Sequence, residues 1–340
     1  MRLLVIGGTH FVGRHAVELA AARGHEVTVF HRGGSEPGHG FPQVEHVHGD
    51  RDGGLGPLKG GSWDAVLDTC GYVPRVVRES AMLLADAAEH YTFVSSLSAY
   101  PDEVGPGATE ETPSHGAPFP DTEEVTGESY GPLKVACEIE VRRAFPGRAS
   151  IVRPGFIVGP HDPIDRFPYW VRRSASGGAM LAPEPADLAV QIVDVRDLAM
   201  FMIDHAEKRT PGVFNVTGPE GVFTMRQLLE ACVEAGAAGT RIVWAGLEFL
   251  RERGLHEPGE HGWEQLPYWY TEEPGFSEFD ISKALAAGLS VRPLAQTIAD
   301  TLAWDRTREQ IWPMGAGLDP QRERELLAEL RGEHGSSSAG

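Results

Sequence analysis

The chain of 340 residues is poor in cysteine, lysine and asparagine, and it has no long hydrophobic run. Its three cysteines, Cys70, Cys137 and Cys232, are far apart and lack C-x-x-C spacing, which argues against a disulfide framework and a cysteine zinc site. No apolar stretch approaches the roughly 20 residues that span a bilayer. No charged and apolar leader precedes the strand-like start MRLLVIGG. We therefore expect a soluble protein of the reducing cytoplasm without a bound metal.

Positive charge is scarce as well. Lysine and arginine total 30 against 49 aspartate and glutamate residues, so the formal net charge is −19. Because such a chain gains little from neutralising phosphates, we predict a small-molecule substrate and no nucleic-acid or membrane partner. The 14 histidines invite a metal interpretation, and His46 and His48 could share one strand face, but no further ligand is spaced to complete a site.

Hydrophobic residues alternate between two periodicities along the first half of the chain. Apolar runs typical of strands buried on both faces occur at residues 2–6, 25–30, 44–48, 63–70, 91–96 and 149–154. Helical spacing separates several of them, at residues 11–23, 75–90 and 131–145. This order predicts an α/β fold with a doubly wound parallel sheet of the Rossmann type.

The second half of the chain is less regular and richer in proline and glycine. It contains predicted helices at residues 167–176, 196–208, 224–235 and 294–307, and returning strands at 191–195 and 212–216. We therefore predict a dinucleotide-binding domain, a smaller mixed substrate lobe and a disordered tail. The domain comprises residues 1–160 with returning segments at about 190–217, the lobe 161–189 and 218–330, and the tail 331–340.

The sequence does not decide the roles of two segments. Residues 101–128 form a long acidic loop, and loops of this length are more often functional lids than idle connections. The segment 262–276 is rich in aromatic residues that could line a substrate pocket or fill the core, namely Trp263, Tyr268, Trp269 and Tyr270.

The stretch VIGGTHFVG joins the first predicted strand to the first predicted helix. Gly7 and Gly8 permit a tight turn and a close approach to a pyrophosphate, and Gly13 permits close packing of helix on strand. The first amides of the helix would then hold the phosphates. His10 stands where such turns usually have a glycine, and its ring could face the phosphates or the solvent. We interpret the whole turn as a cofactor site, formed by Gly7, Gly8, Thr9, His10, Phe11, Val12 and Gly13.

The end of the second predicted strand indicates which dinucleotide is preferred. An acidic residue there would favour the ribose 2′-hydroxyl of NAD, but the sequence has His31 and Arg32, and an arginine accommodates a 2′-phosphate. NADP(H) is therefore preferred, NAD(H) stays open, and the alternative for Arg32 is a surface cation. Asp50, within HGDRDG, is placed to reach the adenine.

A serine, a tyrosine and a lysine form a candidate catalytic set. Tyr130 and Lys134 are four residues apart on a predicted helix, so they share one face. An ammonium beside a phenol favours the phenolate and brings proton exchange closer to neutral pH. Ser96 ends a predicted strand, at the edge where doubly wound folds bind ligands. With Ser129 as the N-cap, Pro132 falls in the first helical turn, where it is tolerated.

The glycine turn and this catalytic set together resemble the short-chain dehydrogenase/reductase superfamily, and specifically its extended NAD-dependent epimerase/dehydratase branch. The resemblance covers residues 1 to about 310 and rests on GGTHFVG, HGDRD, VSSLSAY, YGPLK, VRPGFIVGP, VDVRDLA and VFNVTGP. It is closest to a subgroup with GG-x-x-x-x-G, in which His10 is a subgroup trait.

The resemblance implies further site residues. It implies that the catalytic residues are Ser96, Tyr130 and Lys134, with Lys134 also binding the nicotinamide ribose. It implies that the cofactor is lined by Thr69, Cys70 and Gly71, and that the segment beside the nicotinamide is Pro154 to Phe156.

Two features depart from the resemblance. The only asparagine is Asn215, so the asparagine proton relay of many relatives cannot be assumed. Leu97 and Ser98 stand where sugar 4,6-dehydratases carry an Asp-Glu pair, so dehydration by that route is not expected.

We therefore predict an NADP(H)-dependent oxidoreductase that transfers hydride between nicotinamide and a carbonyl or alcohol carbon. Tyr130 would be the acid or base, and Ser96 would orient the oxygen. One alternative is a nucleotide-sugar epimerase with a retained NAD. Another is a non-catalytic protein that binds RNA or senses the cofactor, because some plant RNA-binding proteins share the GG-x-x-x-x-G trait. A homodimer is common in the superfamily.

Overall fold

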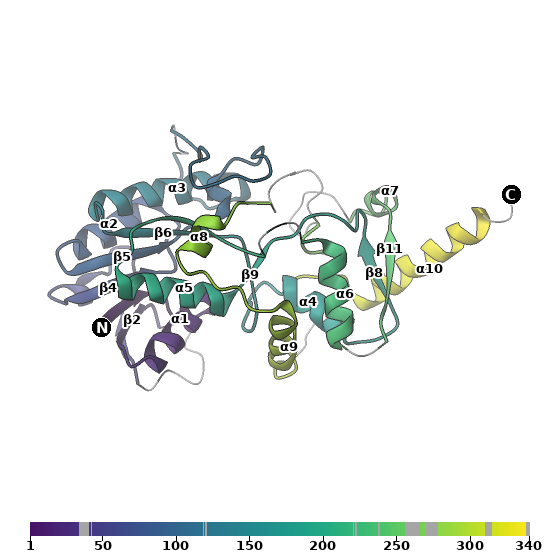
Figure 1. Ribbon diagram of the computed structural model, residues 1–340, viewed down its shortest axis with the longest axis horizontal. Coiled ribbons are helices and arrows are strands. Elements are labelled where there is room, and N and C mark those ends of the chain that lie inside the picture. Colours follow the sequence, from purple (N-terminus) through teal and green to yellow (C-terminus); the bar gives the residue numbers. More distant parts are fainter. Residues whose placement is uncertain are drawn as a thin grey trace. The chain divides into compact units, whose positions relative to one another are not determined.

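The computed structural model describes residues 1–33, 41, 43–117, 119, 121–219, 221, 223–236, 239–255, 265–269, 278–309 and 315–337. The chain divides into two compact units (Figure 1). Unit 1 comprises Met1–Ile157, Ile192–Glu220 and Glu278–Val291. Unit 2 comprises Val158–Gln191, Gly221–Ser277 and Arg292–Gly340.

Unit 1 is built on a seven-stranded parallel sheet with the order β10-β6-β5-β4-β1-β2-β3. The strands are β1 (Arg2–Ile6), β2 (Glu26–His31), β3 (Glu45–His48), β4 (Trp63–Asp68), β5 (Ala88–Val94), β6 (Ala149–Pro154) and β10 (Gly212–Val216). The predicted α/β fold with a Rossmann-type parallel sheet is therefore confirmed. In such a sheet the carboxyl ends of all strands meet at one edge, which is where ligands bind.

Helices cover both faces of this sheet (Figure 1). They are α1 (Phe11–Ala22), α2 (Pro74–Leu84), α3 (Gly127–Ala144), α5 (Val195–Lys208) and α8 (Ser282–Ala286). One face packs against α1 and α5 in a buried cluster that includes Val5, Val17 and Phe201. The other packs against α2 and α3, in a cluster that includes Ile6 and Val141. Because both faces are covered, the strands need continuous apolar runs, and these runs made them visible in the sequence.

Unit 2 is smaller and mixed. Its elements are α4 (Arg166–Ser174), β8 (Ala179–Pro183), α6 (Met225–Gly236), β11 (Arg241–Ala245), α7 (Leu247–Arg251), α9 (Leu294–Asp305) and α10 (Pro320–Ser337). β8 and β11 pair in parallel and were not predicted. A further two-stranded sheet joins β7 (Phe156–Val158) to β9 (Ile192–Asp194). None of the helices described is long and apolar enough to cross a membrane.

Two predicted segments differ from the structure. The helix predicted at residues 75–90 ends at Leu84, because β5 begins at Ala88 and its alternating residues are drawn into the sheet. The tail was predicted to be disordered from residue 331, but α10 continues to Ser337. The charged and small polar residues of this end explain why its composition resembled that of a free terminus.

Part of the aromatic segment lies in the core of unit 2. Tyr268 and Trp269 are buried. The indole nitrogen of Trp269 donates to the backbone oxygen of Glu184 at 2.9 Å, and that of Trp170 donates to the oxygen of Pro267 at 3.0 Å. These contacts support the core interpretation for residues 268 and 269. Trp263 and Tyr270 lie outside the described residues.

The acidic loop is anchored to unit 1 at several points. Val104 and Ala108 belong to a small buried cluster. Farther along the loop, Glu123 accepts a hydrogen bond at 2.7 Å from Arg75 of α2, which also pairs with Asp52 at 2.8 Å. The last two residues of the predicted loop, 127 and 128, belong to α3. The described part of this loop is therefore attached to unit 1 at several points, although its residues 121–128 are exposed.

Candidate functional site

The glycine turn after β1 has the geometry that only glycine tolerates. Gly7 and Gly8 have φ values of +104° and +83°. A Cβ atom on Gly7 would lie 2.4 Å from Oγ1 of Thr69, and one on Gly13 would lie 2.5 Å from the nitrogen of Gly8. The three glycines therefore let the turn fold tightly and let α1 pack against it, as the dinucleotide interpretation requires.

The N-terminus of α1 is free of side-chain caps. His10 is the N-cap in an extended conformation, no side chain accepts from the first turn, and that turn contains no acidic residue. Phe11 and Val12 begin the helix. The exposed ring of His10 has its Nδ1 3.0 Å from Oγ1 of Thr9. Uncapped N–H groups at a helix N-terminus suit an anion, so this end of α1 fits a pyrophosphate.

The carboxyl ends of β2 and β3 hold the candidate adenosine contacts. Arg32 and Asp50 are both exposed there. Nε2 of His31 lies 2.9 Å from Nδ1 of His46, and the rings of His31 and His48 have centroids 4.7 Å apart. Among the residues the structure describes, no group of three or more His, Cys, Asp or Glu side chains could hold a metal ion.

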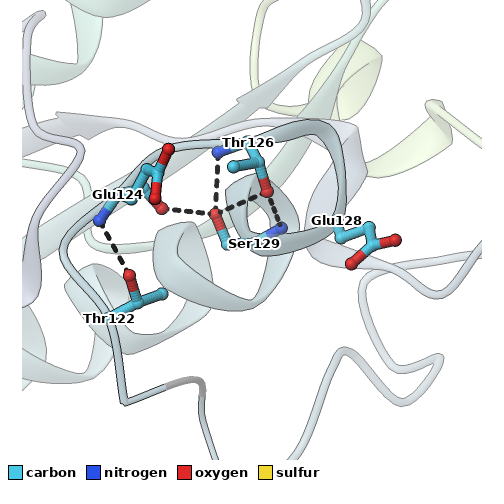
Figure 2. A pocket seen from close by; sticks show the side chains of 5 residues that line it. All are labelled: Thr122, Glu124, Thr126, Glu128 and Ser129. Carbon is cyan, nitrogen blue, oxygen red and sulfur yellow. Dashed lines mark hydrogen bonds between the residues drawn. The ribbon is translucent and has the colours of Figure 1, made fainter.

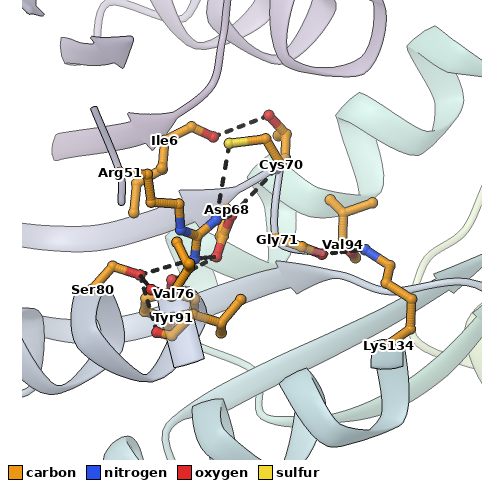
Figure 3. A network of polar contacts seen from close by, with 12 residues as sticks. Ile6, Arg51, Asp68, Cys70, Gly71, Val76, Ser80, Tyr91, Val94 and Lys134 are labelled. Atoms are coloured by element: carbon orange, nitrogen blue, oxygen red, sulfur yellow. Dashed lines mark hydrogen bonds and ion pairs between the residues drawn. The ribbon is translucent and has the colours of Figure 1, made fainter. Parts of the chain in front are cut away.

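A buried ion pair that the sequence analysis missed lies beneath this edge (Figure 3). Arg51 donates to the two carboxylate oxygens of Asp68 at 2.6 and 2.5 Å, and to Oγ of Ser80 at 2.9 Å. The hydroxyl of Tyr91 donates to the same carboxylate at 2.7 Å. Burial opposes the charge of Arg51, but Asp68 raises its pKa above the usual range. The pair ties the loop that carries Asp50 to the end of β4.

Thr69, Cys70 and Gly71 follow β4 and contact neighbours on both sides. Oγ1 of Thr69 donates to the backbone oxygen of Ile6 at 3.1 Å. Burial raises the pKa of the Cys70 thiol, so the thiol is neutral at physiological pH. The backbone oxygen of Gly71 accepts from Nζ of Lys134 at 2.8 Å. This segment thus joins the glycine turn to the candidate catalytic helix.

Ser96 and Tyr130 lie side by side. Ser96 caps the short helix η2 (Leu97–Ala99): its hydroxyl accepts from the Ser98 amide at 3.1 Å, and it lies near enough to the Tyr130 phenol to lower the pKa of that phenol. A Cβ atom on Gly131 would lie 2.0 Å from the backbone oxygen of Ser98. Only glycine at position 131 therefore lets α3 approach η2 this closely. This approach is what brings Tyr130 to Ser96.

The electrostatics of Tyr130 correct the expectation of a stabilised phenolate. Burial raises the pKa of Tyr130, and the nearby Ser96 hydroxyl only partly opposes this rise. Nζ of Lys134 lies 6.0 Å from the centre of the Tyr130 ring and donates to the backbone oxygens of Gly71 and Val94, the latter at 2.7 Å. Because the ammonium is directed to these carbonyls, Tyr130 stays a neutral phenol at physiological pH.

Lys134 is buried, with 3% of its surface exposed. Burial lowers the pKa of Lys134 to about 8, while the thiol of Cys137 and the carboxylate of Asp68 partly oppose the change. Its Nζ lies 4.9 Å from the ring centres of both Tyr72 and Phe93. Tyr72 was not among the predicted site residues, although it directly follows the predicted cofactor-lining turn.

The start of α3 differs from the prediction. Thr126 is the N-cap, not Ser129: the Ser129 amide donates to Oγ1 of Thr126 at 3.2 Å, and the Thr126 amide donates to Oγ of Ser129 at 2.8 Å. Pro132 therefore lies inside the helix, beyond its first turn. A pocket of about 390 Å³ lies at this helix end (Figure 2), lined by Thr122, Glu124, Thr126, Glu128 and Ser129.

The segment implied to lie beside the nicotinamide connects β6 to β7. Pro154 ends β6, and Phe156 begins β7. A Cβ atom on Gly155, between them, would lie 2.5 Å from Oγ1 of Thr217 and 3.2 Å from Cδ1 of Leu97. The segment thus lies next to the residue that follows Ser96.

A second buried ion pair supports the end of β5. Glu138 accepts from Oγ of Ser95 at 2.6 Å and from Nε of Arg153 at 2.8 Å. Glu138 is one helical turn beyond Lys134, and that i+4 spacing was the available sequence signal for a shared face.

Asn215 has a structural role, because its side chain accepts from the hydroxyl of Tyr100 at 2.9 Å within the buried part of unit 1.

Several solved structures similar to this chain are nucleotide-sugar epimerases. UDP-glucose 4-epimerase from Thermotoga maritima, solved with UDP-glucose, is 18% identical, and the match covers 90% of this chain and 99% of that chain with a TM-score of 0.66. The Bordetella bronchiseptica enzyme WbmH, solved with NAD+, is 16% identical, and the match covers 90% of this chain and 98% of that one with a TM-score of 0.64. The chain therefore shares the fold of these structures, the fold that the resemblance implied.

A curated relative has a name that describes binding and not an enzymatic activity. The chloroplast stem-loop binding protein of 41 kDa b from Arabidopsis thaliana is 26% identical, and the match covers 69% of this chain. The chain spans 63% of the length of that relative. No protein-family model matches the chain. The prediction that nucleic acid is not a partner receives no support from this relative.

Proposed function

We propose that unit 1 binds a nicotinamide dinucleotide at the carboxyl edge of its sheet and that the protein is an oxidoreductase acting on a carbonyl or alcohol carbon. The observation that carries this proposal is the convergence of Ser96, Tyr130 and Lys134 at that edge. Ser96 lies close enough to Tyr130 to act on its pKa, and Nζ of Lys134 donates to the backbone oxygen of Gly71 in the cofactor-lining turn.

The residues present fit the cofactor. The left-handed glycines Gly7 and Gly8 and the uncapped start of α1 form a cradle that a side chain would fill. Arg32, exposed after β2 where no acid occurs, favours a 2′-phosphate and hence NADP(H). The solved neighbour with NAD+ keeps NAD(H) as the alternative.

The protonation states favour reduction of a carbonyl. The nicotinamide, when bound, supplies or accepts the hydride. Because Tyr130 is a neutral phenol, it can donate its proton to the carbonyl oxygen as an alcohol forms, and it regains a proton from solvent. The Ser96 hydroxyl donates a second hydrogen bond to that oxygen and aligns it. Burial disfavours the phenolate in both directions, so the preference for reduction rests on the proton that the resting phenol carries.

The test is a comparison of the wild type with Tyr130→Phe. NADPH and NADH titrations followed by fluorescence should give Kd values for both proteins that agree within a few-fold, because the phenol hydroxyl is not part of the phosphate cradle. Turnover of ketones, enones or imines that the wild type reduces should fall by at least about 10²-fold, as for loss of a general acid. A Tyr130→Phe protein that keeps wild-type turnover would refute the assignment.

An epimerase is the second candidate, favoured by the similarity to nucleotide-sugar 4-epimerases. Such an enzyme oxidises and re-reduces its substrate on a retained cofactor and shows no net redox change. Denaturing the purified protein and assaying the supernatant distinguishes the two enzymes. Released NAD would favour the epimerase, whereas exchangeable NADPH would favour the reductase.

RNA binding is the candidate from another class, favoured by the relative whose name describes stem-loop binding. The net charge of −19 opposes it, since phosphate contacts need basic groups. Salt-sensitive retention of the protein on immobilised stem-loop RNA would support it, and passage through the column at low salt would exclude it.

A further inference from the structure

Tyr72 lies at the candidate site without a role in the proposed reaction. It directly follows Gly71, and 45% of its surface is exposed. Its ring centre lies 4.9 Å from Nζ of Lys134 and 6.4 Å from the ring centre of Tyr130. A large aromatic side chain at the surface beside a buried ammonium needs an explanation.

Figure 3 shows Lys134 with the two backbone groups that it contacts, Gly71 and Val94. Two protons of the ammonium are donated to the backbone oxygens of Gly71 and Val94. The ring of Phe93, also 4.9 Å from Nζ, is fully buried. Of the three rings around Nζ, only those of Tyr72 and Tyr130 reach the surface, and Tyr72 is the nearer of the two.

We propose that Tyr72 is a positioning residue whose ring shields the ammonium of Lys134 from water and holds it against the two backbone oxygens. The Lys134 side chain is thereby desolvated and fixed before any cofactor binds. The relevance of this arrangement to catalysis rests on the proposed function, whereas the shielding itself is a property of the free protein.

The electrostatics agree with this geometry. A ring face attracts a cation and excludes water from it, and exclusion of water disfavours the charged form, in line with the lowered pKa of Lys134. The other ionisable groups that act on Lys134 are Arg51, which lowers its pKa further, and Asp68, Cys70 and Cys137, which oppose the lowering. All four of these groups remain in the protein when Tyr72 is replaced.

The hydroxyl of Tyr72 is not needed for shielding. Burial raises the pKa of Tyr72 to about 12, so the phenol is neutral at physiological pH and contributes a ring and not a charge. Tyr72→Phe therefore keeps the proposed role, while Tyr72→Leu and Tyr72→Gln remove the aromatic face. This separates the effect of the ring from that of the hydroxyl.

The test uses the scarcity of lysine. The chain contains only Lys59, Lys134, Lys208 and Lys283, so acetylation by acetic anhydride can be followed for each by peptide mass spectrometry across neutral and alkaline pH. In the wild type and Tyr72→Phe, Lys134 should titrate near 8, below the ordinary lysine pKa of about 10.4. In Tyr72→Leu and Tyr72→Gln the acetylation of Lys134 should be several-fold faster above the titration midpoint, and the midpoint should rise toward the ordinary lysine pKa of about 10.4.

Two results would overturn the proposal. One is acetylation of Lys134 that is the same in all four proteins, including no acetylation in any. The other is a Tyr72→Phe protein that behaves like Tyr72→Leu. Thermal unfolding of each variant shows whether it is folded. If one of the two non-aromatic variants does not fold, the other still tests the proposal. A wild type that binds neither NADPH nor NADH would refute the proposed function while leaving the labelling result intact.

Discussion

At the scale of single residues, Arg51 has the contacts that best explain how the candidate cofactor edge is held. Its guanidinium pairs with both oxygens of Asp68, and Asp68 is completely buried. The pair joins the loop after β3 to the end of β4, and so it fixes the spacing between Asp50 and the turn that begins at Thr69. A buried carboxylate that loses its partner is much more costly than a broken surface pair.

Arg51→Met should therefore destabilise the protein strongly. With the carboxylate of Asp68 left buried and unpaired, we expect the free energy of unfolding to fall by about 3–5 kcal/mol. Chemical denaturation at neutral pH measures this change. The matched control is Arg2→Met, since Arg2 pairs with Glu26 at 3.9 Å at the surface and should matter little. Equal losses in the two variants would mean that Asp68 is not held as a buried anion.

At the scale of elements, α3 determines the catalytic geometry. Its capping box at Thr126 and Ser129 starts the helix three residues earlier than the N-cap predicted from Pro132. Gly131 then allows the helix to approach η2, which aligns Tyr130 with Ser96. The helix is therefore positioned by one cap and one missing side chain.

Gly131→Ala should displace α3 from η2. The added Cβ atom would lie 2.0 Å from the backbone oxygen of Ser98, so the helix must move, and a misplacement of about 1 Å can cost on the order of 10²-fold in turnover. Turnover and the Kd for the cofactor would be measured together, with turnover falling far more.

Gly127→Ala is the control for this substitution, because it lies in the same helix and a Cβ atom there meets nothing within 4 Å. It should keep activity and gain up to about 1 kcal/mol of stability from better helix propensity. Similar losses of turnover in both variants would argue against the close approach at Gly131.

At the scale of the whole molecule, the buried histidines link stability to pH. His90 is completely buried in β5, and its Nε2 lies 3.0 Å from Oγ of Ser150, whose own proton is donated to the backbone oxygen of Thr210. Nε2 of His90 must therefore carry the donated proton. Its Nδ1 has no partner, so a second proton would be buried without an acceptor. Burial accordingly lowers the pKa of His90 to about 4.

His90→Gln should therefore change how stability depends on pH. In the unfolded chain the histidine takes up a proton near its ordinary pKa of about 6.5, whereas the folded state resists it. The contribution of His90 is complete above about pH 6.5 and is lost as the pH falls toward 4. The stability of the wild type relative to His90→Gln should decrease by up to about 3 kcal/mol over this range, as measured by denaturation at several pH values. Parallel pH profiles would show that His90 is protonated as easily in the folded state.

Much of unit 1 could be predicted because its signals are local. The strands at residues 149–154 and 212–216 were predicted with the bounds that the structure has, since continuous apolar runs mark strands covered on both faces. β8 and β11 are as long as β10 but were missed, because each belongs to a two-stranded sheet whose partner lies far along the chain. The glycine turn was readable because a tight turn followed by a close helix requires glycine wherever it occurs.

The sequence by itself determined the parallel sheet, the glycine turn and the order of the candidate residues Ser96, Tyr130 and Lys134. Only the tertiary structure decided their chemistry. It directs the ammonium of Lys134 to backbone oxygens, leaves Tyr130 a neutral phenol and places Tyr72 beside the lysine. The physical reason is that periodicity and turn preference act between neighbours in the chain, whereas burial, ion pairing and desolvation depend on groups that only folding brings together.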